Sequence, residues 1–202
     1  MKSTRFVFDR ALAVLCALLF VSFGFMSCQQ EDDDNGLPDG VYELSSSNNL
    51  VGSWTSSYSE VFEISTSDFS CKDTYAGDNL VVSYSNDDKT VGYIYIKYTE
   101  VYDYAYTEPE DASAWSKVTS GNYTFWKKLS STKKGKWYAV AFKELTASSV
   151  SLSGAYNASG KTSAETLEEA ISTFTIANGY FDIYSECVKQ LVFCFYFLQP
   201  GF

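Results

Sequence analysis

The chain has 202 residues and a formal charge of −10, and it contains no histidine and only two arginines, Arg5 and Arg10. This composition excludes histidine-based catalysis, histidine-bound metals and, beyond the N-terminus, arginine clamps on phosphate. Nucleic-acid binding is not expected either, because it needs a basic surface and this chain is acidic.

The N-terminus is typical of an exported protein. Three basic residues precede an apolar run over residues 11–25, which has the length of a signal-peptide core and is too short to span a membrane comfortably. The run leads directly to Ser27 and Cys28. We therefore predict that residues 1–27 are a signal peptide.

The segment Phe25-Met26-Ser27-Cys28 resembles the lipobox of bacterial lipoproteins, although Phe25 and Met26 depart from the usual leucine and small residue. Looser lipoboxes of this kind are familiar in spirochaete-type lipoproteins. The resemblance implies that Cys28 is acylated and anchors the protein to a membrane of the bacterial cell envelope. Gln29 is not the aspartate of an enterobacterial retention signal, which favours the outer membrane. The alternatives are an ordinary secretory signal with an incidental cysteine, or an uncleaved anchor.

Residues 28–47 are predicted to form a flexible acidic tether. They carry four consecutive acids, Glu31–Asp34, followed by the turn residues Pro38-Asp39-Gly40, and like charges extend such a segment. An EF-hand calcium loop does not fit, because its twelfth position would be Tyr42 instead of glutamate. Removal of the first 27 residues, which hold three basic residues and one acid, leaves 12 lysines against 24 acids, or −12.

Short alternating runs of apolar and polar residues, separated by turn residues, predict a row of β-strands from Leu50 onward. The expected strands are 50–58, 61–65, 80–84, 90–98, 101–106 (a continuation or a separate strand), 122–129, 137–145, 150–152 and 180–185. A short helical turn is expected at 108–111. The strands 122–129 and 137–145 flank a lysine-rich loop, which predicts that they pair as a hairpin.

One late helix is predicted after the capping-box pattern Thr162-Ser163-Ala164-Glu165. Leu167, Ala170, Ile171 and Phe174 then recur at helical spacing, and Asn178-Gly179 ends the helix. About eight strands with one helix predict a mainly β fold, a single antiparallel barrel over residues 48–187. Residues 188–202 form an apolar tail, which is either a buried strand, a clasp on the barrel or an altered C-terminus.

The first strand contains Gly52-Ser53-Trp54, which resembles the Gly-x-Trp start of lipocalin-like domains. The resemblance implies a lipocalin-like barrel in which Trp54 closes one end. Lipocalins usually pack this tryptophan against an arginine of the last strand. The chain has no arginine there, so a lysine would have to substitute without the planar stacking of a guanidinium.

A second resemblance covers most of the chain after the signal. Four segments are similar to a group of uncharacterised spirochaete-type lipoproteins: 135–140, 149–153, 166–170 and 174–181. The group has no function to carry over.

Aromatic residues supply the candidate contact sites. The run Tyr93, Tyr95, Tyr98, Tyr102, Tyr104 and Tyr106 is denser than core filling requires and predicts a surface exposed on one face, although ordinary β-strand composition also explains tyrosines. Lys97 suggests that the face of Tyr93 and Tyr95 meets water. The expected core residues, rather than pocket residues, are Trp54, Phe62, Ile64, Leu80, Val82, Tyr84, Ile94, Ile96 and Phe142.

Cysteines and acids give no catalytic centre. Of Cys71, Cys187 and Cys194, the first two are candidates for one disulfide, and three free buried thiols are the equal alternative.

No histidine is present to activate a thiol, no Gly-x-Ser-x-Gly occurs, and the adjacent acids Asp87-Asp88 and Glu168-Glu169 do not converge. We therefore predict no enzyme activity, no metal and no cofactor.

Two functions remain open from the sequence. The first is the binding of a small, mostly neutral apolar ligand inside the barrel, with Trp54 among its contacts. The second is a surface or structural interaction protein with a filled barrel and a tyrosine-rich outer face.

Overall fold

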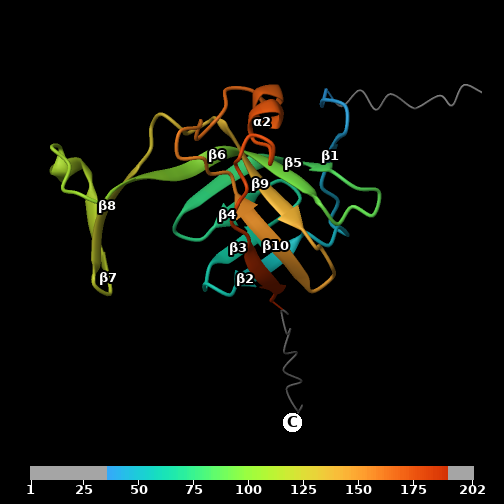
Figure 1. Ribbon diagram of the computed structural model, residues 1–202, viewed down its shortest axis with the longest axis horizontal. Coiled ribbons are helices and arrows are strands. Elements are labelled where there is room, and N and C mark those ends of the chain that lie inside the picture. The colour runs from blue at the N-terminus through green and yellow to red at the C-terminus, as the bar shows by residue number, and fades with distance from the viewer. Residues whose placement is uncertain (1–35, 191–202) are drawn as a thin grey trace, which may run out of the picture. The chain divides into compact units, whose positions relative to one another are not determined.

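Eight antiparallel strands close into a barrel in the computed structural model, which describes residues 36–190 (Figure 1). Each strand pairs with the next one along the barrel, and the last pairs with the first. The barrel strands are β2 (Gly52–Ser56), β3 (Val61–Ile64), β4 (Phe69–Cys71), β5 (Tyr75–Tyr84), β6 (Gly92–Ala105), β9 (Trp137–Lys143), β10 (Ser149–Gly154) and β11 (Ser185–Lys189). The predicted antiparallel barrel is therefore confirmed.

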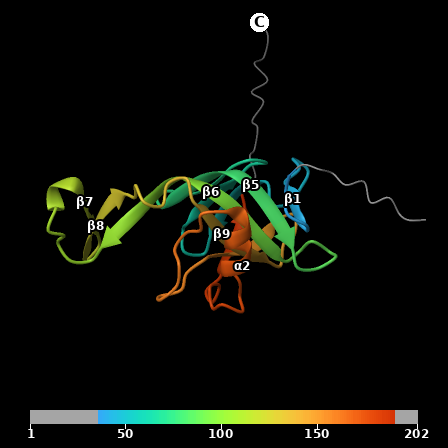
Figure 2. The same ribbon diagram turned by 90° about the horizontal axis from the view of Figure 1, so that it is seen from above.

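The remaining described elements lie outside the ring of eight strands. They are β1 (Val41–Glu43), the 3₁₀ turn η1 (Ala112–Ala114), β7 (Ser116–Ser120), β8 (Tyr123–Leu129) and the helix α2 (Leu167–Thr173). α2 packs against the outside of β9 and β6 (Figure 2). β7 and β8 continue from the far end of β6, away from the barrel (Figures 1 and 2).

The barrel interior is packed by its own side chains. Eight of the nine predicted core residues are buried, and Tyr84 is half-buried. A Cβ atom added to Gly77 would lie 2.8 Å from Ile96 Cδ1, and one added to Gly92 would lie 2.8 Å from the Phe142 ring. An eight-stranded barrel is narrow enough for this filling.

Trp54 is fully buried at one end of the barrel, beneath the last strand. Its indole nitrogen donates a hydrogen bond of 2.8 Å to the carbonyl oxygen of Leu50. The ammonium of Lys189, at the end of β11, lies 4.9 Å from the centre of the Trp54 ring and donates to the Asn49 carbonyl at 2.9 Å. A lysine thus occupies the place expected for the missing arginine.

The folded domain begins before residue 48, so the predicted tether is too long. β1 pairs with Val81–Val82–Ser83 of β5, and the side chains of Val41 and Leu44 are buried. β4 covers only the first part of the ten-residue β5, which leaves the edge of the second part for β1. Cys28, the predicted signal peptide and residues 191–202 of the predicted tail lie outside the described residues.

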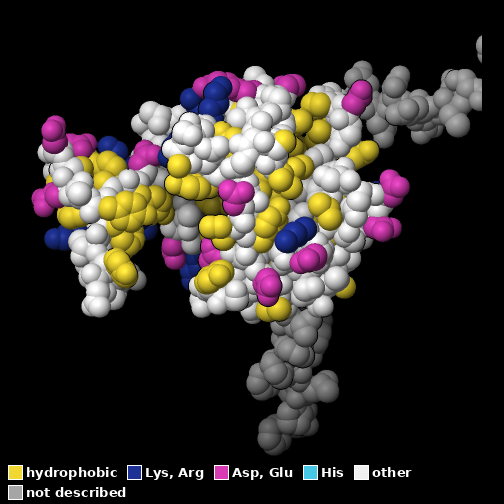
Figure 3. Space-filling view, viewed as in Figure 1, with side chains coloured by type: hydrophobic (Ala, Val, Ile, Leu, Met, Phe, Trp, Pro, Cys, Tyr) yellow, Lys and Arg dark blue, Asp and Glu magenta, His cyan; other side chains and the backbone are white. Residues whose placement is uncertain are grey.

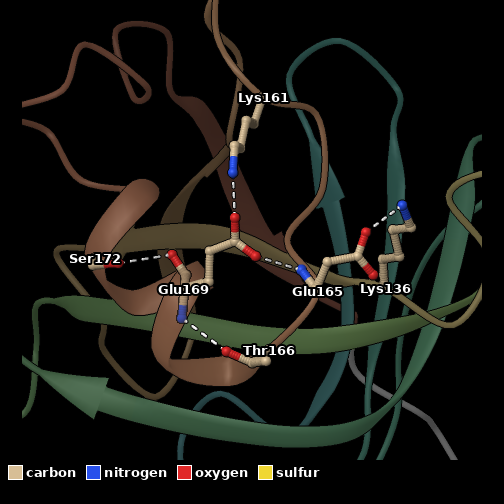
Figure 4. Close-up of polar contacts among 6 residues, drawn as sticks. All are labelled: Lys136, Lys161, Glu165, Thr166, Glu169 and Ser172. Atoms are coloured by element: carbon tan, nitrogen blue, oxygen red, sulfur yellow. Dashed lines mark hydrogen bonds and ion pairs between the residues drawn. The ribbon is translucent and has the colours of Figure 1, made fainter.

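The N-cap of the helix lies four residues after the predicted one, Thr162. Thr166 is the N-cap, and its hydroxyl accepts a hydrogen bond from the Glu169 N–H at 3.2 Å (Figure 4). The Glu169 carboxylate accepts from the Glu165 N–H at 2.7 Å and pairs with Lys161. Thr166 and Glu169 have the same capping-box spacing as Thr162 and Glu165, but residue 164 is committed to a β-bridge with Trp137.

The predicted hairpin of β8 with β9 is wrong, although both strands exist. β6 has 14 residues, and its first half pairs with β9 while Tyr102–Ala105 pair with β8. β8 and β9 therefore both pair with β6 and not with each other.

Other elements also differ from the predictions, among them the end of α2 at Thr173 and the start of β5 at Tyr75. The helical turn lies at 112–114 instead of 108–111. β4 and β7 were not predicted, and the last strand runs over 185–189 instead of 180–185. The barrel therefore extends two residues beyond the predicted boundary at 187.

Candidate functional site

Three tyrosine rings fill the end of the barrel opposite Lys189. Because neighbouring strands are antiparallel, the starts of β5 and β9 lie together at this end, and the end of β11 lies at the other. The rings of Tyr98 and Tyr138 stack with 4.9 Å between their centres, and Tyr75 meets them edge-on at 5.9 and 5.3 Å. We call these three residues the tyrosine plug.

The plug is held by close packing and by one hydrogen bond. A Cβ atom on Gly154 would lie 2.6 Å from the Tyr138 hydroxyl oxygen, so this ring needs glycine beside it. The Tyr138 hydroxyl donates to the Ala155 carbonyl at 3.2 Å, and the ring of Phe174 packs edge-on against Tyr138. Burial raises the pKa of all three plug tyrosines well above the usual value for a phenol. The plug is thus neutral and closes this end.

A carboxylate joins two strands beside the plug. Glu60 accepts hydrogen bonds from the hydroxyls of Ser56, at 2.9 Å, and Ser185, at 2.7 Å. These contacts link the end of β2 to the start of β11. Both hydroxyls donate to the same oxygen of the Glu60 carboxylate, so the role of Glu60 is to hold the two strands together.

The thiols at this end are buried and free. Cys71 and Cys187 do not form the candidate disulfide, because β3 and β2 separate their strands and adjacent strands lie about 4.8 Å apart. Burial raises the pKa of the Cys71 thiol and raises the pKa of Cys187 to about 12. Neither is a nucleophile at neutral pH. Within residues 36–190, no group of three or more acids and cysteines is placed to hold a metal ion.

The predicted tyrosine surface is divided by the fold. Tyr95 and Tyr98 are buried, and Tyr93 is half-buried against the ring of Phe181, 5.4 Å away. The expectation that the face of Tyr93 and Tyr95 meets water is therefore wrong, because α2 and the segment after it cover this face. Trp54 is likewise buried. Of the run, Tyr102 is partly exposed and Tyr104 and Tyr106 are exposed.

Beyond the barrel, β6, β8 and β7 form a three-stranded sheet that we call the arm (residues 102–129). Residues directly opposite each other on paired strands point to the same face of a sheet. The register therefore places these side chains, among others, on one face, which we call the aromatic face: Tyr102, Tyr104, Val118, Tyr123, Phe125, Lys127 and Leu129.

The aromatic face is open to solvent. Tyr123 is 80% exposed, Leu129 is 61% exposed and Tyr104 is 41% exposed. Figure 3 shows hydrophobic side chains gathered over this part of the molecule, separate from the barrel. Exposed apolar groups that cluster in this way mark interaction sites more often than single exposed residues do.

Lysines lie over the aromatic rings of the arm. Lys127 Nζ is 4.5 Å from the centre of the Tyr102 ring, Lys128 Nζ is 4.3 Å from Trp115, and Lys117 Nζ is 5.5 Å from Trp126. Each distance is within the range of a cation–π contact. The rings and the ammonium groups are therefore presented together.

An ion pair fixes the base of the arm. Asp103 of β6 accepts from Lys133 Nζ at 2.7 Å, in the loop that returns to β9. Partial burial alone would raise the pKa of Asp103, but hydrogen bonds from Lys133 and Ser130 outweigh it and hold the pKa below its usual value. Asp103 lies on the segment that enters the arm and Lys133 on the segment that leaves it, so the ion pair holds these two segments together.

Sequence reasoning missed Trp115, Phe125 and Trp126 as site residues. The alternation of aromatic residues and lysines between Trp115 and Lys128 was the available signal. Residues 122–129 were expected to pair with 137–145 as part of the barrel, so the separate surface of the arm was not recognised.

A groove on the outer wall is a weaker candidate. It has a volume of about 480 Å³ and lies over β2, β10 and β11, with Thr55, Ser151 and Gln190 in its lining. The lining is rich in hydroxyl and charged groups, and the groove is outside the barrel, so it does not suit the predicted neutral apolar ligand.

No helix in the described part of the chain is long and apolar enough to cross a membrane. Comparison of the chain with protein-family models, with curated proteins and with solved structures finds no match.

Proposed function

We propose that this chain is a non-enzymatic binding protein of the bacterial cell envelope, in which the barrel is a rigid support and the arm is the contact surface. One observation carries the proposal: the arm presents exposed aromatic side chains beyond the barrel, whereas the barrel interior is occupied by its own side chains. The arm is built on the same strand, β6, that forms part of the barrel wall. A rigid support lowers the entropic cost of binding.

Photo-cross-linking tests the arm as the contact surface. Benzoylphenylalanine replaces Tyr104 or Tyr123 on the arm, and Tyr58 or Tyr156 outside the arm as controls, which are 72% and 74% exposed and so at least as accessible as Tyr104. We expect adducts in intact cells from the two arm positions and none from the two barrel positions. Equal labelling at all four positions, or labelling at the barrel alone, would contradict the proposal.

The proposed location depends on the N-terminal signal. The basic residues, the apolar run and the Ser27-Cys28 pair support export and acylation at Cys28. The full chain made in a bacterium should incorporate labelled fatty acid, and the Cys28→Ser variant should not. Equal incorporation in both would show that the anchor is not at Cys28.

A second candidate is a small neutral ligand inside the barrel, beneath the tyrosine plug. It is favoured by the closed eight-stranded barrel, since a barrel of this size can hold one small ligand, although the packed side chains would have to move apart to admit it. Extraction of the purified protein into organic solvent, followed by mass spectrometry, tests it. One recurrent lipid in stoichiometric amount would support this candidate, and its absence would leave the arm as the binding surface.

A further inference from the structure

β7 lies at an open edge of the arm. It is the last strand in the order of the sheet, and within residues 36–190 β8 is the only strand that pairs with it. An edge strand presents unpaired backbone N–H and C=O groups, to which another strand can add. The free edge of β7 is therefore a contact surface of its own, distinct from the aromatic face.

The turn of the β7–β8 hairpin determines which backbone groups face this edge. Gly121 and Asn122 are the two turn residues, and the φ of +58° at Gly121 suits the first position of a type II′ turn. In a two-residue hairpin the flanking residues, here Ser120 and Tyr123, exchange both backbone hydrogen bonds. Hydrogen-bonded and non-hydrogen-bonded pairs then alternate along the two strands.

Lys117 and Thr119 are the residues that direct their backbone groups to the open edge. Counted from the turn, both belong to pairs that are not hydrogen-bonded to β8. The hydroxyl oxygens of Thr119 and Thr124 lie 3.5 Å apart across the hairpin, in agreement with the close approach of side chains in such a pair. An N–H and a C=O group from each of the two residues are thus available to a further strand.

β7 lacks the features that usually protect an edge strand. It contains no proline, and its pairing with β8 has no register shift that would indicate a bulge. Its one charged side chain, Lys117, lies over the ring of Trp126 on β8, 5.5 Å from the ring centre. The charge is therefore held against a face of its own sheet and does not block the edge.

The sequence of β7 suits pairing with a second copy of itself. The strand reads Ser116-Lys117-Val118-Thr119-Ser120, with a serine at equal distance on either side of Val118. When two such strands pair antiparallel with Val118 opposite Val118, serine is opposite serine and Lys117 is opposite Thr119. No like charges are then directly opposed, and the outward backbone groups of each copy meet those of the other.

We infer that two copies of the chain join through their β7 edges, with a two-fold axis at Val118, into one sheet of three strands from each copy. Directly opposite residues share a face, so both aromatic faces lie on the same side of the joined sheet and neither is covered. β6 is then the outermost strand on each side, and the antiparallel pairing directs the two barrels to opposite ends of the sheet. The inference goes beyond the proposed function, because it doubles the contact surface and gives avidity toward a partner with repeated sites.

Disulfide trapping tests the register, since a contact this small gives a weak, reversible dimer that oxidation can capture. In the inferred sheet the two Val118 residues form a non-hydrogen-bonded pair with Cα atoms about 4.5 Å apart, which is within disulfide range. The two Ser116 residues are offset by about 13 Å along the strands, because each is opposite Ser120.

The experiment compares Val118→Cys with Ser116→Cys in the purified full chain. Peptide mass spectrometry counts only links that join the introduced position to itself, so links through other cysteines do not contribute. We expect about tenfold more linked peptide from Val118→Cys, although Ser116 is the more exposed of the two residues. Random collisions would favour the exposed position instead.

Two further variants test whether the link depends on the backbone of the edge. Val118→Cys with Thr119→Pro removes the outward N–H of residue 119 and leaves the hydrogen bonds between β7 and β8 in place, so the yield should fall about tenfold. Val118→Cys with Thr119→Ala keeps this N–H and should link as well as Val118→Cys alone.

The outcomes separate this inference from the proposed function. Absence of a link from Val118→Cys, equal yields from Val118→Cys and Ser116→Cys, or equal yields from the proline and alanine variants would overturn the pairing through β7. The proposed function would stand after any of these results, because the cross-links expected at Tyr104 and Tyr123 do not depend on the β7 edge.

Discussion

At the scale of single residues, Lys189 packs against both Gly52 and Trp54, so the three residues form one set of contacts. Gly52 has φ +143°, a conformation that favours glycine, and a Cβ atom there would lie 2.5 Å from Lys189 Cε, so a larger residue would also displace the lysine side chain. The ammonium then reaches both the Trp54 ring and the Asn49 carbonyl. Burial lowers the pKa of Lys189, which shows that its charge is partly removed from water and that the ring and the carbonyl are its replacement partners.

Replacement of Lys189 should therefore destabilise the barrel. Lys189→Met should lower the free energy of unfolding by about 1–2 kcal/mol, since it removes a cation–π contact and a hydrogen bond. Lys143→Met is the control, because Lys143 lies 4.4 Å from the ring of the half-buried Tyr184 and should contribute less than about 0.5 kcal/mol. Urea denaturation measures both. Equal losses in the two variants would show that the Trp54 contact has no special value.

The buried thiols give a second residue-scale prediction. Cys71 and Cys187 are buried with raised pKa values, so an alkylating reagent at pH 8 should not modify either in the folded protein. Both should react in urea without any reductant, because they are free. Peptide mass spectrometry measures the modification at each cysteine. Reaction that requires a reductant as well as urea would instead reveal a disulfide.

At the scale of elements, the barrel is extended by two additions of different kinds. α2 covers the outer wall of β9 and β6, where Ala139 and Ala141 are small enough to admit it, and it buries Leu167 and Ala170. The arm covers nothing and exposes its aromatic face. The helix therefore belongs to the core, whereas the arm can change its side chains with little effect on the barrel.

The cap of α2 gives a direct test, because two threonines compete for this role in the sequence. Thr166→Ala should lower stability by about 1 kcal/mol, since the Thr166 hydroxyl accepts from the Glu169 N–H. Thr162→Ala should change it by less than about 0.5 kcal/mol, because Thr162 is exposed and does not cap α2. Thermal unfolding of both variants measures the difference. A larger loss of stability from Thr162→Ala than from Thr166→Ala would mean that Thr162 caps the helix.

At the scale of the whole molecule, local patterns predicted the barrel but not the site. Alternation along each strand identified the inward residues, because that period depends on neighbouring residues only. The exposure of Tyr95 and Tyr104, both on β6, depends instead on what lies over each half of the strand. α2 covers the first half, and solvent covers the second. The pairing of β8 with β6 is similarly non-local. Strands that are consecutive in sequence usually pair, which favoured β9 as the partner of β8, but β8 pairs with β6.

The tyrosine plug makes the stability of the whole molecule depend on alkaline pH. Burial raises the pKa of Tyr75, Tyr98 and Tyr138 in the folded state, whereas tyrosines in an unfolded chain titrate near pH 10. Above that pH the unfolded chain releases protons that the folded chain retains, so stability falls as pH rises. Below about pH 9 these tyrosines are neutral in both states and contribute no pH dependence.

Urea midpoints between pH 8 and pH 11 measure this effect. Each buried tyrosine should reduce the free energy of unfolding by up to about 1.4 kcal/mol per pH unit above pH 10. Tyr138→Phe removes one of the three plug phenols and should make the decline shallower, whereas Tyr123→Phe, on the exposed arm, should leave its slope unchanged. A slope that responds equally to both changes, or to neither, would mean that the plug phenols are open to water and that this end of the barrel is not sealed.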